Sequence, residues 1–203
     1  MSKKCRICKT AFEPTQPFQT WCCPDHGFLI ASGKLDKIKK AAQVKDKRET
    51  KTKLDAMKTR SQWLAEAKKA AQQFRRLEEL ANGSGCISCG RSQEEVAGTD
   101  GWKPGGAWDG GHFLSKGARP ELALEPLNIW LQCKSCNAGS SKYARKGYTV
   151  NAAFRVNLIE RIGIETVEWL ETDWGQKHYS IDDIKRIKAD YMAKTKQLKE
   201  SQS

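Results

Sequence analysis

The sequence lacks long hydrophobic runs. No apolar stretch approaches the roughly 18 residues that indicate a membrane span, so we expect no membrane segment and a soluble protein. No apolar signal segment precedes Cys5, which argues against secretion and against the disulfide framework of short secreted chains. We therefore expect a cytoplasmic, reducing environment, in which cysteines are available to bind metal.

Histidine is scarce, whereas cysteine is concentrated. The 203 residues include three histidines and eight cysteines, and the cysteines form one block near the start and one in the middle. The middle block consists of Cys86, Cys89, Cys133 and Cys136, two Cys-x2-Cys pairs that are 43 residues apart. Two such turns supply the four thiolates of a closed tetrahedral zinc site. Because this site is coordinatively saturated, we expect it to be structural and to hold other residues in place.

The first block predicts a second structural zinc site. We choose Cys5, Cys8, Cys22 and His26 as its ligands, since Cys22-x3-His26 is a normal final pair. Cys23 could replace Cys22. Residues 1–33 hold too little apolar surface for a core, so this zinc knuckle needs its metal in order to fold.

Positive charge dominates the next segment. The net charge is +12, and residues 34–60 alone hold eleven Lys and Arg against four Asp and Glu. With few large apolar residues, this segment reads as a mobile or solvent-bridging linker helix. A one-sided charge run is typical of proteins that bind the phosphate backbone, although a solvated helix face is the alternative.

Residues 61–203 form the third predicted region. An amphipathic pattern with Ser61 as N-cap predicts a helix that ends near residues 81–85, and two further helices are expected at 151–162 and from Ser180 to Lys199. Between residues 86 and 148, Gly, Pro and Trp favour short strands and loops organised by metal. The expected fold class is a small, zinc-stabilised α+β protein with an N-terminal zinc knuckle and flanking helices.

A distinctive pattern lies between the middle cysteines. Trp-Asp-Gly-Gly-His-Phe-Leu occupies residues 108–114, Asn128 stands five residues before Cys133, and Asn137 directly follows Cys136. This pattern resembles the HNH nuclease superfamily, in which a histidine is followed by Asn-Leu-x-x-Leu-Cys, a second cysteine with His or Asn, and a lysine. The matching residues are His112, Asn128 to Cys133, Cys136, Asn137 and Lys142.

Two phage families show further resemblance. The Cys-Asn-Ala-Gly ending at residues 136–139 is similar to that of phage recombination endonuclease VII. A longer resemblance, to the NinG/Rap family of lambdoid phage recombination proteins, covers nearly the whole chain. It rests on Trp-Cys-Cys-Pro-Asp-His-Gly, Arg-Ser-Gln-Trp-Leu, Cys-Ile-Ser-Cys-Gly, Trp-Asp-Gly-Gly-His-Phe and Leu-Ile-Glu-Arg-Ile-Gly.

These resemblances imply an HNH ββα-metal core and a phage-encoded endonuclease that acts in the bacterial host on branched recombination intermediates, such as four-way junctions and D-loops. They imply that His112 is the general base, that Asn128 orients its ring by a hydrogen bond, and that Asp109 and Asn137 hold magnesium or manganese. A homodimer is natural for paired cleavage of a symmetric junction.

One position departs from the superfamily. The metal-binding acid normally precedes the catalytic histidine directly, but here Gly111 does, and Asp109 is three residues back. Either the hairpin bulges at Gly110 and Gly111 to return Asp109 to the metal, or the ligand set differs. A third alternative makes Asp109 an ordinary turn residue.

Basic and aromatic residues around the motif are candidates for DNA contacts. The basic ones are Lys116, Arg119, Lys142, Arg145 and Lys146, each of which could equally be ordinary surface. For Trp102 and Trp108 we favour packing over base stacking. Two rival functions stay open: a non-catalytic zinc protein that binds nucleic acid, and an HNH nuclease of duplex DNA.

Overall fold

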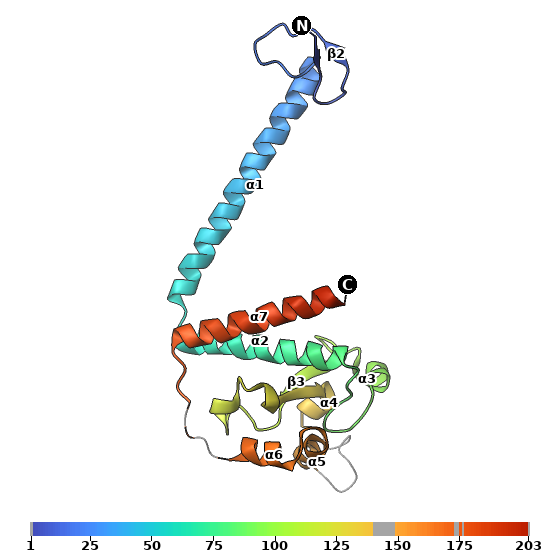
Figure 1. The fold of residues 1–203 in the computed structure, drawn as a ribbon, viewed down its shortest axis with the longest axis vertical. Coiled ribbons are helices and arrows are strands. Elements are labelled where there is room, and N and C mark those ends of the chain that lie inside the picture. Colours follow the sequence, from blue (N-terminus) through green and yellow to red (C-terminus); the bar gives the residue numbers. More distant parts are fainter. Residues whose placement is uncertain (1, 140–148, 173–174, 176, 203) are drawn as a thin grey trace. The chain divides into compact units, whose positions relative to one another are not determined.

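In the computed structural model of the chain, residues 2–139, 149–172, 175 and 177–202 are described (Figure 1). The chain divides into two compact units, residues 1–58 (unit 1) and residues 59–203 (unit 2). None of the described helices combines the length and the apolar character needed to cross a membrane.

Unit 1 consists of a small hairpin and one long helix. Strands β1 (Lys3–Lys4) and β2 (Ala11–Phe12) pair antiparallel, and α1 (Pro24–Met57) follows. Proline suits the first turn of a helix, because its missing N–H would have no partner there. The helix therefore begins at Pro24 and not at the predicted residue 34, so residues 24–33 of the predicted knuckle are helical.

Helix α1 is solvated along its whole length. Its 34 residues, which rise about 50 Å, include no buried side chain. Its ion pairs lie on the surface, as between Lys45 and Glu49 at 3.9 Å. The predicted linker segment is thus helical as far as Met57, and the lysines of α1 face water.

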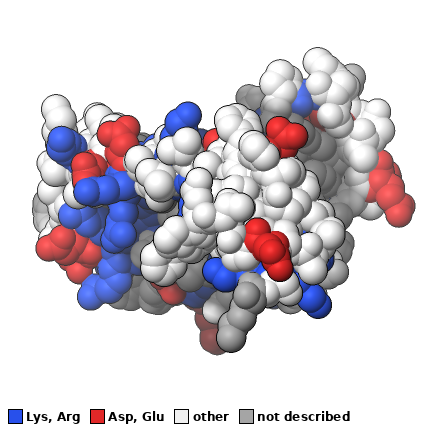
Figure 2. Space-filling model, turned by 90° about the horizontal axis from the view of Figure 1, so that it is seen from above, with Lys and Arg blue, Asp and Glu red and all other residues white. Residues whose placement is uncertain are grey.

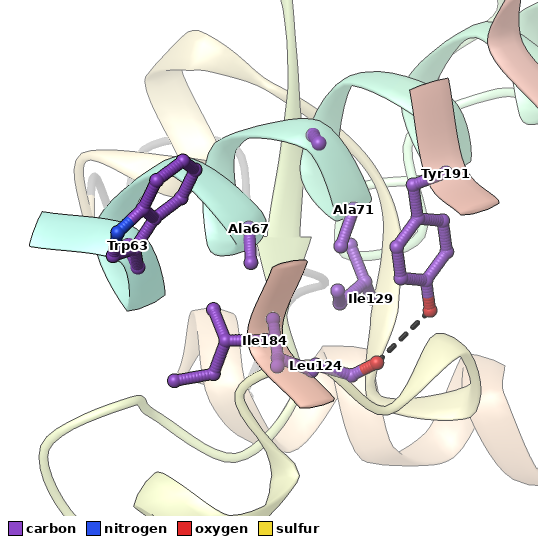
Figure 3. Close-up of a cluster of buried hydrophobic side chains, with 8 residues drawn as sticks. Trp63, Ala67, Ala71, Leu124, Ile129, Ile184 and Tyr191 are labelled. Carbon is purple, nitrogen blue, oxygen red and sulfur yellow. Dashed lines mark hydrogen bonds between the residues drawn. The ribbon is translucent and has the colours of Figure 1, made fainter. Parts of the chain in front are cut away.

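Two long helices build one core of unit 2. Helix α2 (Arg60–Ala81) and helix α7 (Ile181–Ser201) enclose Trp63, Ala67, Ala71, Ile184 and Tyr191 together with residues of the strand region (Figure 3). The Tyr191 hydroxyl donates to the Leu124 carbonyl at 2.9 Å. Thr59, and not the predicted Ser61, caps α2, because Thr59 and Gln62 form a reciprocal capping box. The predicted cap of α7, Ser180, is confirmed.

A hairpin and a short helix form the centre of unit 2. Strand β3 (Trp108–His112) pairs antiparallel with β4 (Ile129–Cys133), with Asp109 opposite Gln132 and His112 opposite Ile129. Helix α4 (Lys134–Asn137) follows at once, which gives the order β-β-α. The connection between the strands contains the turns η1 (Pro120–Leu122) and η2 (Pro126–Asn128), and α3 (Gln93–Asp100) precedes the hairpin.

A second core lies under the hairpin. Helices α5 (Val150–Ile162) and α6 (Ile164–Glu171) bury Phe154, Leu158, Val167 and Leu170 against Ile87 and Trp130. Helix α6 was not expected. The small α+β class is confirmed.

The surface seen in Figure 2 gathers Lys and Arg mainly at its left, with Asp and Glu interspersed. This view therefore shows a mixed surface and not a field of one sign.

Candidate functional site

The central cysteine group, Cys86, Cys89, Cys133 and Cys136, meets at one point. All four sulfur atoms lie within 4.8 Å of one another, and those of Cys89 and Cys133 are 3.9 Å apart. Zinc–sulfur bonds of about 2.3 Å in a tetrahedron would separate two sulfur atoms by about 3.8 Å. The four residues therefore fit a closed zinc site, which would tie the turn after α2 to the end of β4 and to α4.

Arg91 braces this group and was not foreseen. Its guanidinium donates to the Cys89 sulfur at 3.4 Å and to the Cys133 sulfur at 3.2 Å. Hydrogen bonding from the Cys133, Cys136 and Cys86 side chains, with a smaller contribution from Arg91, lowers the pKa of Cys89. The only sequence signal was a basic residue just after the Cys-x2-Cys-Gly turn.

The N-terminal cysteine group consists of Cys5, Cys8, Cys22 and His26, which are also within 4.8 Å of one another. The His26 Nδ1 atom is 3.2 Å from the Cys22 sulfur and 3.6 Å from that of Cys5. A tetrahedral zinc would separate sulfur and imidazole nitrogen by about 3.6 Å. Cys23 lies outside this group and is the N-cap residue of α1, so the structure favours Cys22 over Cys23.

We predict that the purified chain holds two zinc ions, one per group. Elemental analysis of protein prepared in reductant measures this directly. Cys22→Ser should reduce the zinc content toward one equivalent, whereas the matched control Cys23→Ser should retain both. Equal zinc losses in these two variants would contradict the ligand choice.

His112 is half-buried at the end of β3. Its Nε2 atom lies 3.1 Å from the Ala123 carbonyl oxygen, which only accepts hydrogen bonds. The neutral ring therefore keeps its proton on Nε2 and leaves a lone pair on Nδ1. Burial lowers the pKa of His112 from 6.5, and the charges of Lys116 and Lys68 lower it further against the opposing effect of the Ala123 hydrogen bond.

Asn128 does not orient the His112 ring, so that prediction is wrong. Its amide nitrogen donates to the Leu114 and Leu122 carbonyls at 3.0 and 3.1 Å, and its oxygen accepts from the Leu114 N–H at 2.8 Å. These bonds use both amide hydrogens. Fully buried Asn128 therefore braces the loop between the strands, and the Ala123 carbonyl holds the ring.

Asp109 and Asn137 lie together. The Asn137 amide donates to Asp109 Oδ2 at 3.0 Å, and the Lys134 ammonium is 3.8 Å from Asp109 Oδ1. These two residues line an open pocket of about 460 Å³, the Asp109 pocket, whose other walls include Lys69 and Arg76 of α2.

The bulge at Gly110 and Gly111, one of the alternatives that the sequence left open, is absent. Strands β3 and β4 pair residue by residue from Trp108 to His112, and successive side chains of a strand alternate in direction. Asp109 and His112, three positions apart, therefore point to opposite faces of β3. The glycines instead permit close approach: a Cβ atom on Gly110 would lie 2.6 Å from the Gln72 carbonyl oxygen, and one on Gly111 would lie 2.0 Å from Gln132 Oε1.

Helix α2 runs antiparallel to β3 and supplies residues that the sequence reading missed. The Arg76 guanidinium donates to the Trp108 carbonyl at 3.3 Å, and the Gln72 amide donates to the Gly110 carbonyl at 2.8 Å. Four helical residues rise about 6 Å and two strand residues about 6.7 Å, so the two series stay aligned. The sequence signal was the four-residue spacing of these polar positions.

The family described as NinG, Bacteriophage Lambda NinG protein, matches residues 1–201. The chain belongs to the NinG family. Protein ninG of Escherichia phage 933W is 35% identical over 214 residues, which cover 99% of this chain and 96% of that protein. The proteins of that name from Salmonella phage P22 and Escherichia phage lambda are 35% and 34% identical, each over 97% of this chain and 92% of theirs. No solved structure matches.

The NinG match spans both cysteine groups and the hairpin, but it carries no statement of activity. Among the predicted phosphate-binding residues, Lys116 is exposed. The prediction that Arg119 binds phosphate is corrected, because its guanidinium is engaged within the protein. It pairs with Glu121 and donates to the Glu171 and Thr172 carbonyls at 3.2 and 2.6 Å. It holds the loop to the end of α6. Lys142, Arg145 and Lys146 lie outside the described residues.

The two tryptophans near the motif differ. Trp108 is 8% exposed and packs in the core around the central cysteine group, as predicted. Trp102 is 79% exposed, and its indole N–H donates to the Thr99 carbonyl at 3.0 Å. The packing interpretation is therefore wrong for Trp102, whose ring is open to solvent.

We predict that His112 of this NinG protein is neutral at neutral pH, with its proton on Nε2 and its pKa below 6.5. Long-range ¹H–¹⁵N correlation spectra recorded from about pH 5 to 8 measure both properties. With three histidines in the chain, the His112→Ala spectrum assigns the signal. A proton on Nδ1, or a pKa above 6.5, would contradict the geometry.

Proposed function

We propose that this NinG protein is a metal-dependent endonuclease that acts on branched DNA recombination intermediates, such as four-way junctions and D-loops. The observation that carries the proposal is the Asp109 pocket. It combines two oxygen-bearing side chains, Asp109 and Asn137, with the cationic groups of Lys69 and Arg76. Oxygen ligands suit a hard divalent cation, and the cationic groups suit phosphate oxygens.

The residues present fit magnesium or manganese. The Asp109 carboxylate offers oxygen directly, and half a turn of the exposed Asn137 amide would present Oδ1 beside it. Two protein ligands leave positions for water and phosphate, as magnesium usually requires. The bound cation would stabilise the charge that develops on the phosphate and on the leaving oxygen.

His112 would serve as the general base through Nδ1, the nitrogen that the Ala123 contact leaves without a proton. In an in-line displacement, the attacking and leaving oxygens lie on opposite sides of phosphorus. A base and a cation are then needed several ångströms apart. Three residues along β3 separate the two positions by about 10 Å.

Preference for branched DNA is supported by the resemblance to phage recombination nucleases and by the basic character of the chain. Such an enzyme would recognise DNA by shape and by its backbone, and paired cuts across a symmetric junction would favour a homodimer. The structure supports backbone contacts at exposed lysines, including Lys116 and those of α1.

The test uses the purified, zinc-loaded chain with matched linear, nicked, flapped and four-way DNA. We expect cleavage of the four-way junction in preference to linear DNA, with magnesium or manganese required. Substitution of Asp109→Ala or Asn137→Ala should raise the magnesium concentration needed before activity is lost. If none of these DNAs is cut with either metal, the nuclease proposal fails.

A second candidate is a zinc protein that binds DNA without cutting it. It is favoured by the placement of Asp109 and His112 on opposite faces of β3, and by the contacts of Asp109 with Asn137 and Lys134. A protein of this kind would bind junctions equally well with and without magnesium. The same cleavage assay therefore separates the two candidates.

Helix α1 leads to a prediction about salt. Lys40, Lys47 and Lys51 share one face of α1 by their spacing and are exposed. Replacing all three by glutamine should weaken binding to every DNA shape alike. The slope of log affinity against log salt should flatten by about 0.9 for each phosphate that the variant no longer neutralises. Arginine at the same positions, which keeps the charge, is the control, and an unchanged slope in the glutamine variant would show that the helix is only solvated.

A further inference from the structure

Lys68, a half-buried residue of α2, lies four residues before Gln72, in the same series of positions that contacts β3. Arg76 contacts Trp108 and Gln72 contacts Gly110, so the next position of the series, Lys68, is aligned with His112. Lys68 is on the same stripe of α2 as Gln72 and Arg76. Unlike these two, Lys68 has no hydrogen bond to a carbonyl of the described strand β3.

Lys116 lies in the loop after β3, and its charge acts on both Lys68 and His112. Asn128 fixes this loop by its hydrogen bonds to Leu114, two residues before Lys116. The charges of Lys68 and Lys116 both act on His112, and they act on each other: burial lowers the pKa of Lys68, and the charge of Lys116 lowers it further. Both lysines are therefore near enough to His112 for their charges to act on it.

Among the described residues, no acidic side chain forms an ion pair with either lysine. Within the described part of the chain, neither Lys68 nor Lys116 has a hydrogen-bond or ion-pair partner. The positions three and four residues away from Lys68 on α2 are Leu64, Ala65, Ala71 and Gln72, none of them acidic. Like charges repel each other, and the charge of Lys116 opposes the protonated form of Lys68. A bound anion would remove this repulsion.

We propose that Lys68 and Lys116 form an anion site beside His112 that binds one phosphate group of a nucleic-acid strand. Ammonium groups bind phosphate as point charges, and two of them from separate elements would hold one group between α2 and the loop. The identity of the strand as DNA rests on the proposed function. The anion site itself rests on the lysines and does not require cleavage. Within the nuclease, it would position a phosphate next to the Nδ1 atom of His112.

The first arm of the test titrates inorganic phosphate into the full, zinc-loaded chain and follows the His112 ring signals by NMR. We expect these signals to shift, and Lys68→Met or Lys116→Met to weaken phosphate binding by about tenfold, the loss of one charge-assisted hydrogen bond. The matched control is Lys196→Met, which removes one exposed charge from α7. Lys68→Arg keeps the charge and should retain binding.

The second arm replaces phosphate by a short single-stranded DNA without added magnesium. The DNA should shift the same His112 signals and compete with inorganic phosphate. If the DNA neither shifts these signals nor displaces phosphate, the site binds small anions only and the strand proposal is overturned. Phosphate binding unaffected by Lys68→Met, or weakened equally by Lys196→Met, would also overturn it. Because neither arm requires cleavage, a protein that binds phosphate here but cuts no DNA would refute the nuclease and leave the anion site standing.

Discussion

Replacing His112 by alanine is expected to lower the rate of junction cleavage by about 100- to 10,000-fold, the usual contribution of a general base. Junction affinity and zinc content should change little. Binding energy comes from dispersed phosphate contacts, whereas the base acts only as the bond breaks. His112 also belongs to neither cysteine group, so its loss leaves the zinc ligands intact.

His178→Ala is the matched control, because His178 is exposed and lies outside the motif. Rates are measured with saturating enzyme on a four-way junction, and affinities without magnesium. Normal cleavage by His112→Ala would show that the base has been wrongly assigned. Loss of binding along with cleavage would instead indicate that the ring supports the local structure.

Replacing Cys133 by serine is expected to unfold the centre of unit 2. Zinc binding contributes about 10 to 16 kcal/mol to the folding of zinc-finger peptides, whereas a whole domain is stable by about 5 to 15 kcal/mol. The Cys133 sulfur also accepts from Arg91, and its residue ends β4, so the hairpin and α4 would lose their common anchor. Circular dichroism should show a cooperative melt for the wild type and its loss in Cys133→Ser.

Two further variants locate this effect. Cys23→Ser should melt as the wild type does, because Cys23 is in neither cysteine group. Cys8→Ser should release the N-terminal zinc but leave the melt of unit 2 in place, since the two units are separately compact. An unchanged melt for Cys133→Ser would mean that the cores on either side of the hairpin hold it without metal.

Both cysteine groups could be predicted from the sequence because zinc ligands are set by local spacing. A Cys-x2-Cys turn presents two sulfur atoms whatever lies around it. The cap of α7 is similarly local, since Ser180 and Asp183 satisfy each other's backbone within one turn. Even so, the start of α1 was misplaced, because Pro24 was not recognised as a helix-starting residue.

The arrangement around His112 depends on contacts between distant segments and could not be predicted. The sequence around Asn128 does not indicate that its side-chain amide donates to the Leu114 and Leu122 carbonyls. Likewise, the pattern Asp-Gly-Gly-His fits a bulge as well as the close packing of α2 on Gly110 that the structure contains. The contacts of Gln72 and Arg76 with β3 could not be predicted, because the apolar periodicity of α2 indicates which residues enter the core but not what the polar residues contact.

The alignment of α2 with β3 also limits how the family can evolve. One residue inserted between Lys68 and Arg76 would turn the helix by about 100° and move Gln72 or Arg76 away from its carbonyl. One residue inserted in β3 would exchange the two faces of the strand. The alignment with the phage 933W protein spans 214 positions against 203 residues here, so gaps separate the two sequences. We expect these gaps to fall outside residues 68–76 and 108–112, because a change of length in either segment would break its alignment with the other.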